Sequence, residues 1–268
     1  MRMKDLIAKR KRREAQRARA ERNAREQQVQ TENLTNENYQ LPAEFSEQVI
    51  RELKHLPTTI TNEEILRRRD MRDILTFTID PDDAKDFDDA LSFQVLETGN
   101  YQIGIHIADV THYVTPGSVV DNEAVERATS VYLVDRTVPM LPERLCNELC
   151  SLRPHEDKLC FSAIFTLNEN LEIVDEWFGR TVIHSDRRFA YEEAQKVIET
   201  GEGDMKEEIL TMHNIAQTLR KERFRKGAIA FSRREAKFHL DENGKPTGVY
   251  FKVQKEANQL IEEFMLLA

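Results

Sequence analysis

The sequence predicts a mixed α/β fold, in which a mostly antiparallel sheet is flanked by helices. Segments in which apolar and polar residues alternate, such as residues 75–79 (LTFTI), are typical of strands that enter a core. Several of these segments follow one another closely, and a short turn near Gly99 and Asn100 favours antiparallel neighbours. The 268 residues, 40% of them hydrophobic, suffice for one domain with an extended start.

The elements are expected in the following order. Helices are predicted at about residues 43–54, 62–69, 118–129 and 205–226, with a last one from about residue 255. Strands are predicted at about residues 75–79, 90–96, 100–107, 159–167, 171–184, 228–232, 236–240 and 248–253. Pro57 stops the first helix, and an acidic turn beginning at Asn62 opens the second. Asn243-Gly244 is the dipeptide typical of a two-residue hairpin turn.

Charge divides the chain into unequal parts. Residues 1–30 hold eleven Lys and Arg against four Asp and Glu, a net charge of +7 in a chain of net charge −9. Residues 1–37 are therefore predicted to be a basic arm and polar linker, helical or disordered because they lack an apolar stripe. The arm either contacts nucleic-acid phosphates or is a solvated tail with internal ion pairs. Residues 38–72 are expected to lead into the main domain, residues 73–268.

Several classes of protein are disfavoured by composition. No apolar run is long enough to span a membrane, and the charged N-terminus lacks the apolar centre of a secretory signal, so we expect a cytoplasmic protein without membrane contact. Cys146, Cys150 and Cys160 have no CxxC spacing and are expected to be reduced, structural thiols. The sequence has no GxxxxGKS/T, GxGxxG or GxSxG motif, so neither a nucleotide cofactor nor a serine nucleophile is expected.

The ten residues 80–89 (DPDDAKDFDD) are the most informative stretch, because they hold six carboxylates against one lysine directly after a predicted strand. Carboxylates forced together repel one another, and they remain solvated, take up protons or share a cation. An oxygen-only ligand set suits Mg²⁺ or Mn²⁺. A calcium loop is excluded, because Lys85 stands where such a loop needs glycine. The alternative is an ordinary solvated acidic loop.

The surrounding motifs carry a family resemblance. The strings TIDPDDAKDFDDALSF (78–93), IGIHIADVTHYVTPGSVVDNEA (103–124) and LCSLRPHEDKL (149–159) resemble the RNB-type exoribonucleases, and ribonuclease R more than ribonuclease II. The resemblance implies processive hydrolysis of RNA from its 3′ end to nucleoside 5′-monophosphates, with Mg²⁺ as cofactor. The implied partner is single-stranded RNA, or structured RNA with a 3′ overhang.

The resemblance also assigns site residues. The family's four active-site aspartates, which hold the metal, fall on Asp80, Asp86, Asp88 and Asp89. The family's base-stacking tyrosine falls on Tyr132, and Glu235 resembles the glutamate that grips the final nucleotides.

The resemblance further implies oligonucleotide-binding domains on both sides of the catalytic domain and a later arginine-bearing stretch, for which no SPIRRY-like run is found. We therefore expect residues 73–268 to be a partial RNB catalytic domain, weakly active or inactive alone. We also expect the last helix to expose Leu260, Ile261, Phe264 and Leu267. The alternatives are a catalytically dead RNA-binding or scaffold protein, against which the four aspartates argue, and a product that does not fold stably.

Two other clusters have competing interpretations. His106, Asp109 and His112 have the spacing of an HxxDxxH metal motif, but His106 lies on an alternating strand, and structural roles are favoured. The basic run 220–226, with Arg233, Arg234 and Lys237 after it, is either one wall of a single-strand channel or a solvated helix end.

Overall fold

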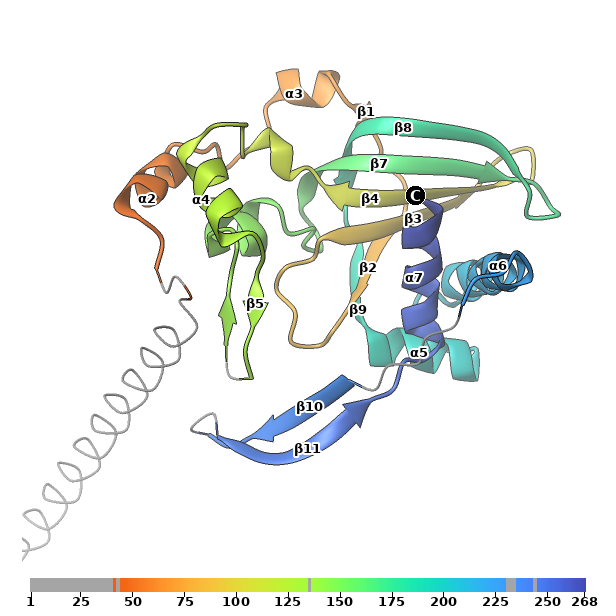
Figure 1. Ribbon diagram of the computed structural model, residues 1–268. Coiled ribbons are helices and arrows are strands. Elements are labelled where there is room, and N and C mark those ends of the chain that lie inside the picture. Colours follow the sequence, from red (N-terminus) through yellow and green to blue (C-terminus); the bar gives the residue numbers. More distant parts are fainter. Residues whose placement is uncertain (1–40, 42–43, 135, 230–234, 243–244) are drawn as a thin grey trace, which may run out of the picture.

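A seven-stranded sheet is the centre of the computed structural model, which describes residues 41, 44–134, 136–229, 235–242 and 245–268 (Figure 1). Its strands are β1 (Arg69–Asp70), β2 (Thr76–Asp80), β3 (Asp89–Val95), β4 (Tyr101–Ala108), β7 (Asp157–Leu167), β8 (Ile173–His184) and β9 (Arg187–Ala190). They lie in the order β1-β8-β7-β4-β3-β2-β9. The pairs β1–β8 and β2–β9 are parallel and the other four are antiparallel, so the predicted mixed and mostly antiparallel sheet is confirmed.

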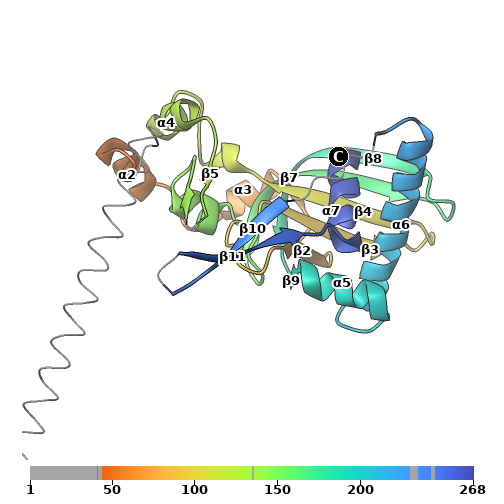
Figure 2. The ribbon, with the colours of Figure 1, turned by 60° about the horizontal axis from the view of Figure 1, so that its bottom comes forward.

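Three helices cover one face of this sheet, namely α5 (Tyr191–Thr200), α6 (Lys206–Arg225) and α7 (Glu256–Leu267) (Figures 1 and 2). Apolar side chains of the sheet, such as Phe77 and Ile105, form one core with helix residues such as Ile209. The expectation that α7 exposes Leu260, Ile261, Phe264 and Leu267 is wrong, since even Leu267 is partly buried against this core. Leu260 and Phe264 are fully buried and Ile261 is nearly so, because α7 packs between α5, α6 and the sheet.

A second core lies where the N-terminal helices meet the sheet. It receives side chains from α2 (Glu47–Lys54) and α4 (Val119–Arg127), and from a π-helical turn at Arg144–Leu149. The hydroxyl of Ser46 accepts a hydrogen bond from the amide of Val49, and this N-cap starts α2 a few residues later than predicted. The remaining small elements here are α3 (Asn62–Leu66), a 3₁₀ turn at Val110–His112, and the hairpin of β5 (Val131–Tyr132) and β6 (Thr137–Val138).

A separate two-stranded hairpin consists of β10 (Glu235–Leu240) and β11 (Pro246–Lys252) (Figure 1). The predicted turn at Asn243-Gly244 lies outside the described residues. So does most of the predicted strand at 228–232, whose described residues 228 and 229 have no regular structure. The predicted basic arm, residues 1–37, also lies outside the described part. No helix within the described part is both long and apolar enough to cross a bilayer.

Sequence patterns missed β9 and α5. The strand β9 has only four residues, two of them Arg187 and Arg188, so it shows no apolar alternation. It nevertheless extends the sheet, because it pairs with β2 in parallel and places Ala190 opposite Asp80.

Candidate active site in the loop between β2 and β3

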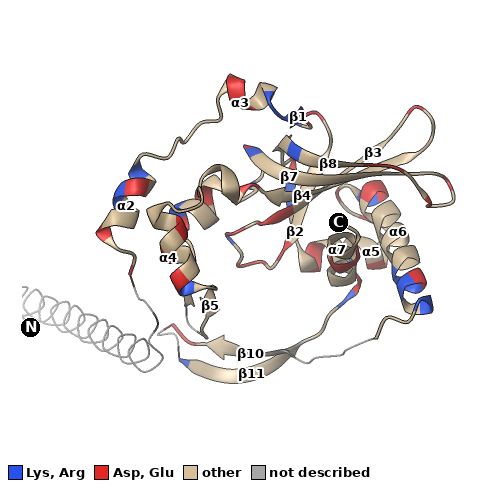
Figure 3. Ribbon diagram, turned by 45° about the horizontal axis from the view of Figure 1, so that its top comes forward, with Lys and Arg blue, Asp and Glu red and all other residues tan. Residues whose placement is uncertain are grey.

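The acidic run connects two buried strands. β2 ends at Asp80, β3 begins at Asp89, and the intervening residues form an irregular loop that Figure 3 shows in red and blue. All five residues of β2 are buried, and Asp80 at the end of this strand is only 8% exposed.

Burial and mutual repulsion perturb three of the four predicted aspartates. Burial, with smaller contributions from Asp89 and Asp88, raises the pKa of Asp80 to about 7. Burial and then Asp88 raise the pKa of Asp89 to about 6. The pKa of Asp88, an exposed residue, is also raised, first by partial desolvation and then by Asp86. Asp80, Asp88 and Asp89 are therefore within electrostatic reach of one another, and Asp86 is within reach of Asp88.

One oxygen of the Asp80 carboxylate has no hydrogen-bond partner in the described part of the chain. This atom, Oδ2, is buried. The Thr78 hydroxyl lies near enough to lower the pKa of Asp80, but it does not reach hydrogen-bonding geometry. A buried, unpaired carboxylate oxygen is costly, and a divalent cation is one partner that removes the cost.

The four aspartates have the right chemistry for a hard cation, but their carboxylates are not already arranged around a common metal position. Their side chains offer only carboxylate oxygens, the ligands that Mg²⁺ and Mn²⁺ take. Among the described residues, however, no three Asp, Glu, His or Cys side chains are placed to hold one ion. The carboxylates of the acidic loop must therefore turn towards each other to share an ion.

Tyr191 is a site residue that the sequence reasoning missed. It begins α5 directly after Ala190, the residue opposite Asp80. Burial, and then the charges of Asp89 and Asp80, raise the pKa of Tyr191 to about 12, so its phenol remains protonated at neutral pH. The sequence did contain a signal for the start of this helix, namely Glu193 at its third position. The Glu193 carboxylate accepts a hydrogen bond from the Ala190 amide at 2.9 Å.

Tyr132 lies on β5 with 71% of its surface exposed. Partial burial, then Asp86 and Asp88, raise the pKa of its hydroxyl, which shows that the side chain is within electrostatic reach of the acidic loop. Tyr132 is thus an exposed aromatic residue near the carboxylates, and its role as a base-stacking residue stays a prediction. Glu235 is the first residue of β10 and pairs with Lys252, but its side chain lies outside the described part.

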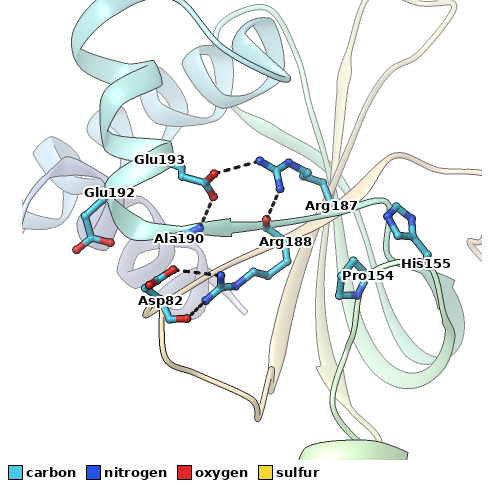
Figure 4. A pocket seen from close by; sticks show the side chains of 8 residues that line it. All are labelled: Asp82, Pro154, His155, Arg187, Arg188, Ala190, Glu192 and Glu193. Atoms are coloured by element: carbon cyan, nitrogen blue, oxygen red, sulfur yellow. Dashed lines mark hydrogen bonds and ion pairs between the residues drawn. The ribbon is translucent and has the colours of Figure 1, made fainter. Parts of the chain in front are cut away.

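A hollow of about 600 Å³ adjoins the loop on the side of β9 (Figure 4). It is lined by Asp82, Pro154, His155, Arg187, Arg188, Ala190, Glu192 and Glu193. Arg187 is held in this hollow by Glu193 at 3.3 Å and by Asp204 at 3.2 Å. None of the four candidate metal-binding aspartates lines it.

The other histidine and aspartate candidates have structural partners. His106 is fully buried, with its ring nitrogens 2.7 Å from Ser162 Oγ and 2.8 Å from Ser92 Oγ, and burial lowers its pKa to about 3. Asp109 forms an ion pair with Arg68 at 2.8 Å, and His112 lies 3.6 Å from Glu64.

Four cations of the basic run 220–226 form ion pairs, and two of these, Arg225 and Lys226, pair with Glu222 of the same run. Arg220 and Arg223 reach the buried carboxylate of Glu263 on α7, at 2.8 and 2.6 Å. These two arginines therefore join α6 to α7, which favours a structural role over a channel wall. Arg233 and Arg234 lie outside the described residues. The three cysteines are free, and burial raises the pKa of each thiol.

Comparison with known proteins identifies related sequences and structures. The family model described as "RNB domain" matches residues 68–268. DIS3-like exonuclease 2 of Schizosaccharomyces pombe is 47% identical over 240 residues, which cover 84% of this chain and 26% of the relative. Ribonuclease R of Mycoplasma genitalium, solved with ribose-methylated single-stranded RNA, has a TM-score of 0.77 and 28% identity over 85% of this chain and 36% of that chain.

Not every relative is described as active. A protein of Arabidopsis thaliana named "Inactive exonuclease DIS3L2" is 39% identical over 243 residues, which cover 84% of this chain and 23% of the relative. The chain spans between about a quarter and a third of the length of the curated relatives that it matches first.

Proposed function

Because the chain belongs to the RNB-domain family, we propose that it acts as a 3′→5′ exoribonuclease whose acidic loop holds Mg²⁺ or Mn²⁺. The substrate is single-stranded RNA, or structured RNA with a 3′ overhang, and the products of processive hydrolysis are nucleoside 5′-monophosphates. The observation that carries the proposal is the buried Oδ2 atom of Asp80, which has no hydrogen-bond partner among the described residues and lies within electrostatic reach of Asp88 and Asp89.

The carboxylates of Asp80, Asp86, Asp88 and Asp89 would hold the cation. When bound, it would lower the pKa of a water nucleophile and neutralise charge on the phosphate. In the metal-free protein, the raised pKa of Asp80 means that this carboxyl holds a proton part of the time at neutral pH. Metal binding therefore releases a proton and removes the repulsion between the carboxylates.

The other side chains act on the RNA. The exposed ring of Tyr132 offers a flat surface to a base, and stacking contributes ~1–3 kcal/mol per base without regard to sequence. The hydroxyl of Tyr191 lies beside Asp80 and Asp89 and also interacts with the Asn258 side chain, and it is placed to contact an oxygen of the terminal nucleotide. Glu235 grips the final nucleotides, as the resemblance implies.

A catalytically dead RNA-binding or scaffold protein of the same fold is the second candidate. The relative named as inactive, at 39% identity, favours it. The presence of all four aspartates in the acidic loop favours an active enzyme.

The two candidates differ in their products. The protein, as residues 1–268 and as the longest natural chain that contains them, is incubated with Mg²⁺ and a single-stranded RNA labelled at its 3′ end. Immediate release of the labelled nucleoside 5′-monophosphate, abolished by a chelator, supports the exoribonuclease. RNA binding without release at any Mg²⁺ or Mn²⁺ concentration supports the scaffold. We expect residues 1–268 alone to be slow, because they span only about a quarter of the relative from Schizosaccharomyces pombe.

A further inference from the structure

The acidic loop is held mainly by residues outside it. Between β2 and β3, one backbone hydrogen bond closes within the loop, from the Ala84 amide to the Pro81 carbonyl at 3.1 Å. The carboxylates of this loop repel one another and the loop has few internal hydrogen bonds, so its own interactions do not stabilise a single conformation. Its shape must therefore come from neighbouring segments.

Ser151 fixes the backbone on both sides of Asp86. Its hydroxyl accepts a hydrogen bond from the Phe87 amide at 3.1 Å and donates one to the Lys85 carbonyl at 2.8 Å. The next residue, Leu152, donates its amide to the Phe87 carbonyl at 2.8 Å. Ser151 is completely buried, so no water can replace its hydroxyl without a change in packing.

Arg188 fixes the other end of the loop. Its Nη2 atom donates to the carbonyls of Pro81 and Asp82, at 2.5 and 2.9 Å, and its Nη1 atom lies 3.7 Å from the Asp82 carboxylate (Figure 4). Its guanidinium also lies 5.6 Å from the centre of the Phe87 ring. Arg188 is on β9, which pairs with β2, so the sheet fixes the backbone from which this side chain extends.

We propose that Ser151 and Arg188 are positioning residues that set the shape of the acidic loop in the metal-free protein. Because the backbone is fixed at residues 81–82 and 85–87, the carboxylates need mainly side-chain rotations to converge on an ion. Metal binding then costs less conformational entropy than it would in a loop with a mobile backbone, and this favours binding. The effect on metal affinity and catalysis rests on the proposed function, but the effect on loop shape does not.

Four variants separate positioning from general stability. Ser151→Ala removes both side-chain hydrogen bonds, and Arg188→Ala removes the bonds to Pro81 and Asp82. Arg188→Lys keeps a positive donor and should restore part of the effect. Ser185→Ala is the matched control, because Ser185 is equally buried and its hydroxyl has no hydrogen-bond partner among the described residues.

The first readout is amide hydrogen exchange in the metal-free protein. Ser151→Ala should accelerate exchange of the Phe87 amide, and Arg188→Ala that of the Ala84 amide, while the strands of the sheet stay protected and Ser185→Ala changes neither. Unchanged exchange of both amides, or acceleration spread evenly over the sheet, would overturn the proposal.

The second readout is the affinity for Mn²⁺ alone, followed by electron paramagnetic resonance. Each alanine variant should bind Mn²⁺ about ten-fold more weakly, the loss expected for a hydrogen bond of ordinary strength. The half-saturating Mg²⁺ concentration should rise in parallel, with kcat at saturating Mg²⁺ retained. A lowered kcat at every Mg²⁺ concentration, with unchanged Mn²⁺ affinity, would contradict positioning. If the unaltered protein binds no Mn²⁺ and hydrolyses no RNA, the proposed function fails, and hydrogen exchange alone decides the positioning of the loop.

Discussion

Asp80 and Ala190 lie opposite each other in the parallel pairing of β2 with β9. This pairing determines what surrounds the carboxylate, because the chain enters α5 at the next residue and brings Tyr191 to within electrostatic reach of Asp80 and Asp89. The same short strand supplies Arg188, which holds the start of the acidic loop. The four-residue edge strand β9 thus places Arg188 and Tyr191 beside the carboxylates of the acidic loop.

Asp80 and Asp89 should destabilise the metal-free protein as the pH rises. The pKa of Asp80 is raised to about 7 and that of Asp89 to about 6, first by burial, so between about pH 4 and pH 7 these two carboxyls bind more protons in the folded state than in the unfolded state. The free energy of unfolding contributed by these groups therefore decreases as the pH rises through this range. His106, which is buried and neutral, acts in the opposite direction, because its pKa is lowered to about 3. The contribution of the aspartates is therefore read from a comparison in chelator, in which Tm should decrease more, or increase less, from pH 5 to pH 8 in the unaltered protein than in Asp80→Asn.

The variant Asp80→Asn tests the cause of this pH dependence, because it removes the buried charge without changing the size of the side chain. It should raise the Tm at pH 8 in chelator, by ~2–4 °C for each kcal/mol regained in a domain of this size. Mg²⁺ should raise the Tm of the unaltered protein and not that of the variant. A variant that is less stable than the unaltered protein at pH 8 would show that the Asp80 charge is already compensated.

Tyr132→Ala should change the length of the residual product. The ring is exposed near the acidic loop, so its loss removes a stacking surface without leaving a cavity in the core. Short RNAs should dissociate earlier, and the final product should be longer, while turnover on long RNA falls only modestly. Gel analysis of the product ladder measures this change, and an identical ladder for both proteins would reject the assignment.

Tyr191→Phe should lower kcat and leave RNA affinity nearly unchanged. The substitution keeps the ring in its half-buried position and removes the hydroxyl beside Asp80 and Asp89, together with its interaction with Asn258. Loss of one donor to the substrate should lower the rate by ~10-fold. Single-turnover hydrolysis measures the rate, with Tyr113→Phe as a control, because Tyr113 is another partly buried tyrosine and packs in the second core. Equal losses in both variants would point to a packing effect.

Much of the sheet could be predicted from the sequence, because β2, β3, β4, β7 and β8 show apolar alternation or close turns. The density of carboxylates in residues 80–89 likewise identified the candidate site before any geometry was known. The parallel pairing of β9 with β2 could not be predicted, since it joins residues about 110 positions apart through a strand that contains two arginines. The burial of Asp80 and the proximity of Tyr191 both depend on that pairing.

The prediction for α7 failed for a related reason. A helix with an apolar face at the end of the sequence suggested exposed surface, but Leu260 and Phe264 pack against the sheet and its neighbouring helices. Sequence periodicity identifies an apolar face, whereas tertiary packing decides what covers it.

Asp88→Asn is the substitution that tests the central claim most directly. It removes one charge from the acidic loop and keeps the size of the side chain. The measurement compares hydrolysis and binding of one labelled single-stranded RNA, with Mg²⁺, in the unaltered protein and in the variant, each as the longest natural chain containing residues 1–268. The account predicts that the variant loses nucleotide release and binds the RNA nearly as tightly as the unaltered protein. A variant that releases nucleoside 5′-monophosphates at the unaltered rate, or that stays folded and loses RNA binding, would contradict a catalytic role for the acidic loop.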